Sequence, residues 1–63
     1  MSIGEKLKSL RGNRSREEVA KALGIALSTL TMYENNRRVP RDDIKVRISR
    51  YYGTPIEELF FSS

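Results

Sequence analysis

The chain has 63 residues, of which 12 are Lys or Arg and 8 are Asp or Glu, so its net charge is +4. A chain of this length buries only about 60% of the surface that its unfolded form exposes, so a catalytic cleft would compete with the core for the same side chains. It has no cysteine and no histidine, which excludes disulfides, thiol chemistry, imidazole acid–base chemistry and the usual zinc sites. We therefore expect a protein that is not an enzyme and that needs neither a metal nor a cofactor.

Two helices are predicted in the first part of the chain, over residues 3–11 and 15–23. Their apolar residues recur at the spacing of one buried helix face: Ile3, Leu7 and Leu10, then Val19, Ala20 and Leu23. Gly12 favours the end of the first helix, because glycine readily adopts the left-handed conformation found there. Ser15 and Glu18 have the spacing of a capping box, in which each side chain accepts a hydrogen bond from the backbone N–H of the other residue.

A third, short helix is predicted over residues 27–35, directly after a turn at Gly24 and Ile25. Leu30 and Tyr33 lie three residues apart and should pack inward. The rest of this helix is polar, which is unusual for a helix that serves only to fill a core. A basic loop that contains Pro40 follows it.

The C-terminal part predicts two further helices, over residues 42–52 and 55–60. Ile44, Ile48, Tyr51 and Tyr52 share one face of the first, and Ile56, Leu59 and Phe60 anchor the second. Thr54 and Glu57 have the spacing of a second capping box, with Pro55 at the favoured first helical position. No segment alternates apolar and polar residues as a strand does, so the fold class is predicted to be all-α.

The second and third helices carry the most specific pattern in the chain. Ala20 is small where two helices would cross, and Gly24 permits a tight turn between them. The positions that must face the core are all apolar: Val19, Leu23, Ile25, Leu30 and Tyr33. This pattern predicts a helix-turn-helix whose second helix offers its outer side to a DNA major groove. The basic net charge agrees with a polyanionic partner such as nucleic acid.

With these residues in view, the chain resembles the Xre family, the Cro- and lambda-repressor-like helix-turn-helix domains. The resemblance runs through IGEKLKSLR, SREEVAKALGI, STLTMYENNRRVP and YYGTPIEELF. It implies a compact five-helix bundle, formed by residues 1–63 as a single domain. It also implies a bacterial or phage transcriptional regulator, most often a repressor, that binds double-stranded DNA at a two-fold operator as a homodimer. The expected location is then the cytoplasm, at the nucleoid.

The resemblance assigns roles to individual positions of this chain. The side chains expected to contact bases are Ala26, Leu27, Ser28, Thr31 and Met32. Those expected to contact phosphates or the minor groove are Arg16, Asn35, Asn36, Arg37, Arg38 and Arg41. Arg11 and Glu34 match a pair that forms a structural ion pair in the family.

Several positions depart from the family pattern. Ala26 stands where a capping Ser or Thr is usual, Asn36 replaces a glycine, and Lys45 replaces an aliphatic residue. The predicted recognition helix has no Arg, Lys or Gln between Leu27 and Tyr33. We therefore expect modest sequence specificity, or specificity that DNA shape and the Arg37–Arg41 loop supplement.

Simpler interpretations of the same residues remain open at this point. Ser28, Thr31 and Met32 would also fit a solvated helix face, the loop arginines would also serve solubility, and Arg16 would also suit any helix start. Phe61 follows Phe60 directly, so one short helix cannot easily bury both. We expect Phe61 to form a dimer contact or a junction with further chain. The alternative function is a protein-interaction module on the same fold, such as an antitoxin-like domain.

Other classes of protein find little support in the sequence. The N-terminus is charged within five residues and lacks the apolar stretch of a signal peptide. No run approaches the roughly eighteen apolar residues of a membrane span. No Gly-rich phosphate loop is present, no small-molecule ligand is evident, and the adjacent carboxylates lie at predicted helix starts rather than as an acid–base pair.

Overall fold

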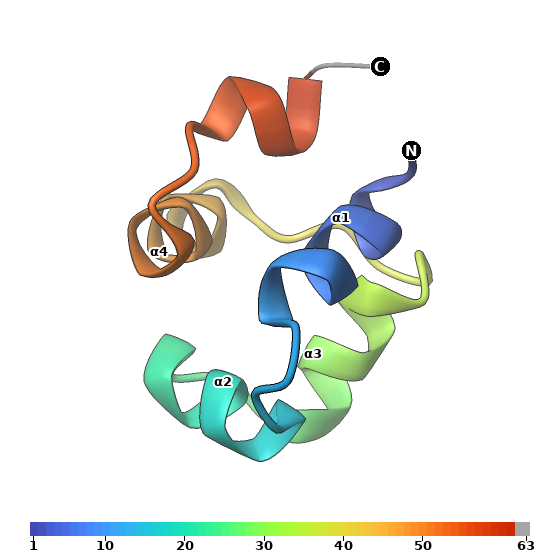
Figure 1. Cartoon of the computed structure of the whole chain (residues 1–63), viewed down its shortest axis with the longest axis vertical. Helices are drawn as coiled ribbons and strands as arrows, with labels where there is room; N and C mark the ends of the chain where they lie inside the picture. The colour runs from blue at the N-terminus through green and yellow to red at the C-terminus, as the bar shows by residue number, and fades with distance from the viewer. Residues whose placement is uncertain (62–63) are drawn as a thin grey trace.

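The structure is a computed structural model that describes residues 1–61, which form four α-helices and a short π-helix (Figure 1). The helices are α1 (Ile3–Arg11), α2 (Arg16–Leu23), α3 (Leu27–Glu34), α4 (Asp42–Tyr52) and η1 (Glu57–Phe61). The prediction of an all-α, five-helix fold is confirmed, and α1 and α4 have the predicted bounds. Helix α2 begins one residue later than predicted and α3 ends one residue earlier. Among residues 1–61, no helix combines the length and the apolar character that a membrane crossing requires.

Hydrogen bonds at the helix starts differ from the prediction. A complete capping box begins α1, where Ser2 Oγ accepts from the Glu5 N–H and Glu5 Oε1 accepts from the Ser2 N–H, each at 3.1 Å. The backbone bond from Ser2 lowers the pKa of the Glu5 carboxyl. At α2, Ser15 Oγ accepts from the Glu18 N–H at 3.1 Å. The reciprocal half of that predicted box is absent from the described residues, where the Glu18 side chain is exposed.

The predicted second capping box is wrong, and the helix predicted over residues 55–60 is present but shifted to Glu57–Phe61. Thr54 Oγ1 donates to the carbonyl of Tyr52, and the Thr54 N–H donates to the carbonyl of Ser49. Thr54 therefore completes the end of α4 and does not start the next helix, because Gly53 turns the chain back in the left-handed conformation. Element η1 begins only at Glu57.

The core lies between all five helices. Helix α3 contacts α1 and α2, while α4 contacts α2 and η1 contacts α1. The buried apolar residues come from every element: Leu7, Val19, Ala20, Leu23, Leu30, Tyr33, Ile44, Ile48 and Leu59. These include all the residues that the sequence placed on the inner faces of the predicted helix-turn-helix, except Ile25, which is partly buried against the core. The core holds α3 at the surface of the molecule (Figure 1).

An aromatic cluster lies at the C-terminal end of α4. The rings of Tyr51 and Tyr52 meet edge to face with centroids 5.0 Å apart, and the Arg14 guanidinium lies 5.3 and 5.8 Å from the two centroids. The Tyr52 hydroxyl is buried and has no hydrogen-bond partner among the described residues. Burial, and then the negative charge of Glu34, raise the pKa of Tyr52 to about 12.

We expect Tyr52→Phe to make the protein less sensitive to alkali. Between pH 10 and pH 12 an unfolded chain loses the Tyr52 proton that the folded chain keeps, so stability falls as pH rises through this window. Without solvent screening, the free energy of unfolding would fall by about 1.4 kcal/mol for each pH unit in this window. The actual fall is smaller, because the ring is only half-buried and solvent screens the charge. Urea unfolding of both proteins at pH 8 and pH 11 measures it. If both proteins lost the same stability between pH 8 and pH 11, the raised pKa of Tyr52 would not be the cause.

Candidate nucleic-acid interface

Helix α3 offers a polar side to solvent. Successive residues of an α-helix are rotated by about 100°, so the buried residues Leu30, Tyr33 and Glu34 share one side. The side chains of Ser28 and Asn35 lie on the opposite side and are exposed. Of the predicted base contacts, Ala26, Leu27 and Ser28 are exposed, and Thr31 and Met32 are half-buried. The structure thus leaves all five at least partly accessible around the outer side of α3.

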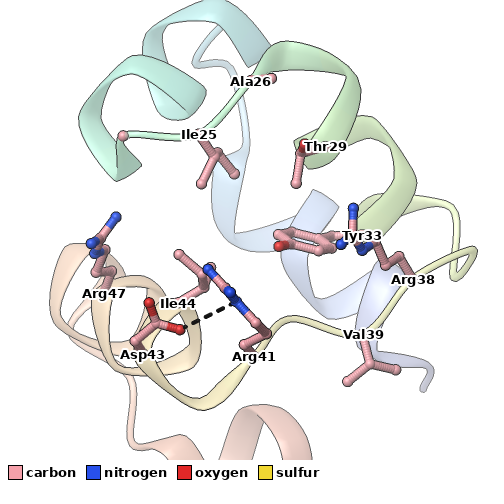
Figure 2. Close-up of a pocket in the computed structure, with 11 residues that line it drawn as sticks. Ile25, Ala26, Thr29, Tyr33, Arg38, Val39, Arg41, Asp43, Ile44 and Arg47 are labelled. Carbon is pink, nitrogen blue, oxygen red and sulfur yellow. Dashed lines mark ion pairs between the residues drawn. The ribbon is translucent and has the colours of Figure 1, made fainter.

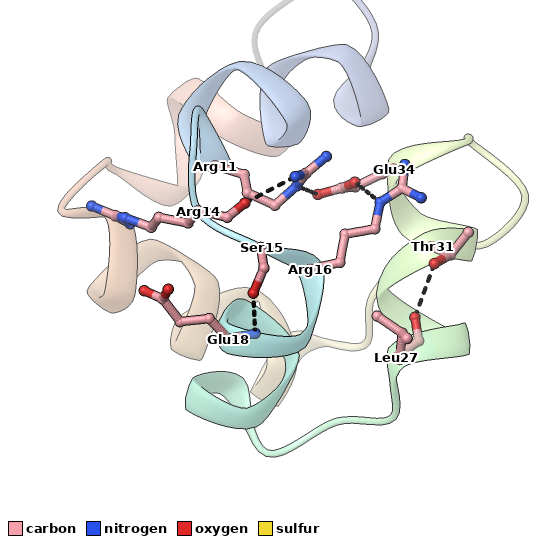
Figure 3. Close-up of polar contacts among 8 residues, drawn as sticks. All are labelled: Arg11, Arg14, Ser15, Arg16, Glu18, Leu27, Thr31 and Glu34. Carbon is pink, nitrogen blue, oxygen red and sulfur yellow. Dashed lines mark hydrogen bonds and ion pairs between the residues drawn. The ribbon is translucent and has the colours of Figure 1, made fainter.

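The Thr31 hydroxyl is already engaged within α3. Its Oγ1 donates to the carbonyl of Leu27 at 3.0 Å (Figure 3). A hydroxyl has one hydrogen, so Thr31 retains its acceptor lone pairs and its methyl group for an outside partner. At the start of the same helix, Ala26 makes no side-chain capping bond, as expected for an alanine in that position.

A buried carboxylate forms one flank of α3. Glu34 is fully buried, and its Oε2 and Oε1 each accept one hydrogen bond of 2.8 Å, from Arg11 Nε and Arg16 Nε respectively (Figure 3). Arg11 Nη1 also donates to the carbonyl of Arg14. The structure therefore contains the Arg11–Glu34 ion pair, and it adds Arg16 as a second partner that sequence reasoning missed. These contacts join α1, α2 and α3 at one point.

Three further arginines gather on the other flank of α3. Arg38, Arg41 and Arg47 line a pocket of about 340 Å³ together with Ala26, Thr29 and Tyr33 of the turn and α3, and with other residues (Figure 2). Arg41 pairs with Asp43 at 3.7 Å on the exposed surface. Arg47 Nη1 donates to the carbonyl of Leu23 at 3.2 Å, which ties α4 to the end of α2. Sequence reasoning did not identify Arg47, because only tertiary contacts bring α4 to this turn.

The two arginine groups lie on opposite flanks of α3. Glu34, which holds Arg16, follows the buried Leu30 by four residues, whereas Thr29, which lines the pocket, precedes it by one. At about 100° per residue, these positions fall on opposite sides of Leu30. The exposed side of α3 thus lies between Arg16 on one flank and the arginine group formed by Arg38, Arg41 and Arg47 on the other.

The residues directly after α3 are exposed, and one of them, Asn36, also has a structural role. Asn35, Arg37 and Arg38 are exposed. Asn36 adopts a left-handed φ of 59°, and its side chain accepts from the Gly4 N–H at 2.9 Å and donates to Ser2 Oγ at 3.1 Å. The Asn36 amide, predicted to contact the DNA backbone, therefore holds the start of α1 against the end of α3.

A second surface surrounds the C-terminal aromatic residues. Phe61 is 70% exposed. Lys45 has a side chain that is only 15% exposed, and its ammonium lies 5.4 Å from the Phe60 centroid and 5.2 Å from that of Phe61. The cation thus packs against the rings at a position where an aliphatic residue is usual.

Comparison with known proteins identifies the family. A helix-turn-helix family model matches residues 5–59, which include all of α2, α3 and α4. The chain is 33% identical over 63 residues to the cryptic phage CTXphi transcriptional repressor RstR of Vibrio cholerae. This match covers 97% of the chain and 57% of that relative, so the chain spans little more than half of its length. The protein belongs to the helix-turn-helix family, and within it to the Cro- and lambda-repressor-like domains.

Proposed function

We propose that this chain binds double-stranded DNA in a sequence-specific manner and acts as a transcriptional repressor, or as the DNA-binding part of one. The observation that carries this proposal is the position of α3 between two groups of arginines. The DNA major groove is about 12 Å wide, admits one helix and is bordered by a phosphate backbone on each side. A polar helix with cations on both flanks matches that arrangement of charge. The resemblance to a protein named a transcriptional repressor supports the same function.

In this proposal, α3 reads base edges through Ala26, Leu27, Ser28, Thr31 and Met32. Leu27 and Met32 would contact thymine methyl groups, and Ser28 would donate to or accept from several bases. Because the Thr31 hydrogen is already bonded to Leu27, this hydroxyl would accept from a base amino group, which adenine and cytosine provide in the major groove. None of these contacts is a bidentate guanine contact, so direct readout is modest.

Contacts with the DNA backbone would come from both flanks of α3 and from the loop that follows it. Arg16 would bind phosphate on one side, and Arg38 and Arg41 would bind phosphate or enter the minor groove on the other. Asn35 and Arg37 are exposed beyond the end of α3 and would extend these contacts. Asn36 would take part through the second hydrogen of its Nδ2, because its backbone N–H donates to the carbonyl of Tyr33 and the first Nδ2 hydrogen is bonded to Ser2 Oγ.

The operator would have two-fold symmetry and bind a homodimer. Two such domains reading the same face of DNA place half-sites about 10–10.5 bp apart, centre to centre. The exposed Phe61, with the Lys45 ammonium beneath it, would contribute an apolar dimer contact. A regulator of this kind would act in the cytoplasm, at the promoters of a bacterium or phage, by occupying DNA without catalysis.

Selection of sites from a random duplex library tests this function. We expect a palindromic consensus that binds about a thousandfold more tightly than scrambled DNA. Ser28→Ala and Met32→Ala should relax specificity, while Arg37→Gln should weaken binding to all sequences and reduce the salt slope by about one. Phe61→Ser should weaken binding to the palindrome more than to a half-site. Failure to select a consensus, with weak binding that only follows salt, would favour the protein-interaction module instead.

A further inference from the structure

Arg16 has one part of its guanidinium bound inward and one part unused. Its Nε donates to Glu34 Oε1 at 2.8 Å, and the side chain remains 36% exposed. None of the hydrogen bonds among the described residues uses its two Nη nitrogens. Arg16 is the first residue of α2 and reaches across to the end of α3 (Figure 3). The guanidinium is therefore fixed on one edge and free to donate from the other.

We propose that Arg16 bridges the buried Glu34 and one phosphate of the DNA backbone, and that Glu34 is the positioning residue that directs the guanidinium to this phosphate. This inference rests on the proposed DNA binding. A guanidinium has five N–H donors in a planar fork, so it can serve a carboxylate through Nε and a phosphate through Nη1 and Nη2 at once. A lysine ammonium is a single point of charge and cannot hold both partners in a fixed geometry.

The surroundings of Glu34 make it suited to this positioning role. The carboxylate is fully buried, and its second oxygen is held by Arg11 Nε at 2.8 Å. Arg11 is itself only 19% exposed and is tied to the carbonyl of Arg14. Glu34 therefore cannot turn away from Arg16, and the Arg16 side chain loses less freedom when a phosphate binds.

The charges of this cluster also suit a phosphate. Arg11 and Arg16 supply two positive charges against the single negative charge of Glu34, which leaves one positive charge in excess. A bound phosphate diester would balance it. The cluster would therefore have no net charge only when a DNA phosphate is bound.

The sharpest test changes the Glu34 carboxylate, because electrostatics alone and the positioning role predict opposite changes in DNA affinity. Glu34→Gln removes a negative charge, so if charge alone mattered it would tighten DNA binding. With Glu34 as the positioning residue, we expect it to weaken binding to the selected duplex about tenfold. The matched control is Glu17→Gln, which removes an exposed carboxylate beside Arg16 at the start of α2 and should tighten binding.

A second pair of variants decides the matter even if Glu34→Gln fails to fold. Arg16→Lys keeps the charge and can still pair with Glu34, so its melting temperature should stay close to that of the unmodified protein. Its affinity for the selected duplex should nevertheless fall about tenfold, as for Arg16→Gln. Arg16→Lys with unchanged affinity, or Glu34→Gln that binds as tightly as Glu17→Gln, would overturn the bridge while the unmodified protein still binds its operator. If the unmodified protein selects no operator, the proposed function itself fails.

Discussion

Replacing Arg11 with methionine is expected to lower the free energy of unfolding by about 3 kcal/mol, because it leaves a fully buried carboxylate with half of its charge compensation. A domain of this size has only about 5 kcal/mol of stability, so the variant should keep about 2 kcal/mol and unfold at a much lower urea concentration. The remaining bond from Arg16 comes from a more exposed side chain and cannot replace both partners. Urea unfolding followed by circular dichroism measures the change.

A double variant serves as the control for this prediction. Arg11→Met combined with Glu34→Leu removes the buried charge together with its deepest partner, and apolar replacements of both members of a buried pair are often neutral or stabilising. We expect the double variant to unfold at a higher urea concentration than Arg11→Met alone. An Arg11→Met protein as stable as the unmodified one would show that Arg16 alone suffices for Glu34.

Gly4→Ala is expected to lower the free energy of unfolding by about 2 kcal/mol, the reverse of its usual effect within a helix. Replacing an exposed glycine inside a helix with alanine usually raises the free energy of unfolding by about 1 kcal/mol. Here, a Cβ at residue 4 would collide with the backbone carbonyl of Glu34 and touch the side chain of Asn36. Helix α1 would have to move away from the end of α3, which would stretch the bond from the Gly4 N–H to Asn36 Oδ1.

Gly53→Ala provides the comparison for this steric effect. A Cβ at Gly53 meets nothing within 4 Å, and its only cost is the positive φ of 64°, about 1 kcal/mol for an alanine. Thermal unfolding of both variants should therefore rank Gly4→Ala as the less stable. If Gly4→Ala instead raised the melting temperature, the close contact between α1 and α3 would not exist in solution.

The ion-pair cluster connects stability with the proposed function. Glu34 joins α1, α2 and α3 through two arginines, and one of these is the residue proposed to bind phosphate. A change at Arg11 should therefore act mainly on folding, and a change at Arg16 mainly on DNA affinity. Measuring both properties for each variant separates the two roles of the cluster.

Local sequence was sufficient to predict most of the helices. Apolar spacing identified all five, and Gly12 and Gly24 marked two helix ends correctly, because these signals depend on neighbours within one or two turns. The capping box of Ser2 and Glu5 was also readable from its spacing and was missed. The box at Thr54 had the same spacing and was wrong, because that residue is bonded to the end of α4.

The contacts that build the interface were decided by tertiary structure. The sequence predicted the accessible side of α3, the arginines and the Arg11–Glu34 pair, but not that Arg16 shares the same carboxylate from 18 residues away. It did not predict that Asn36 closes onto Gly4, 32 residues earlier, or that Arg47 lies beside the turn before α3. Helix periodicity is a local property of the backbone, whereas these partners meet only after the core has set the angles between the helices.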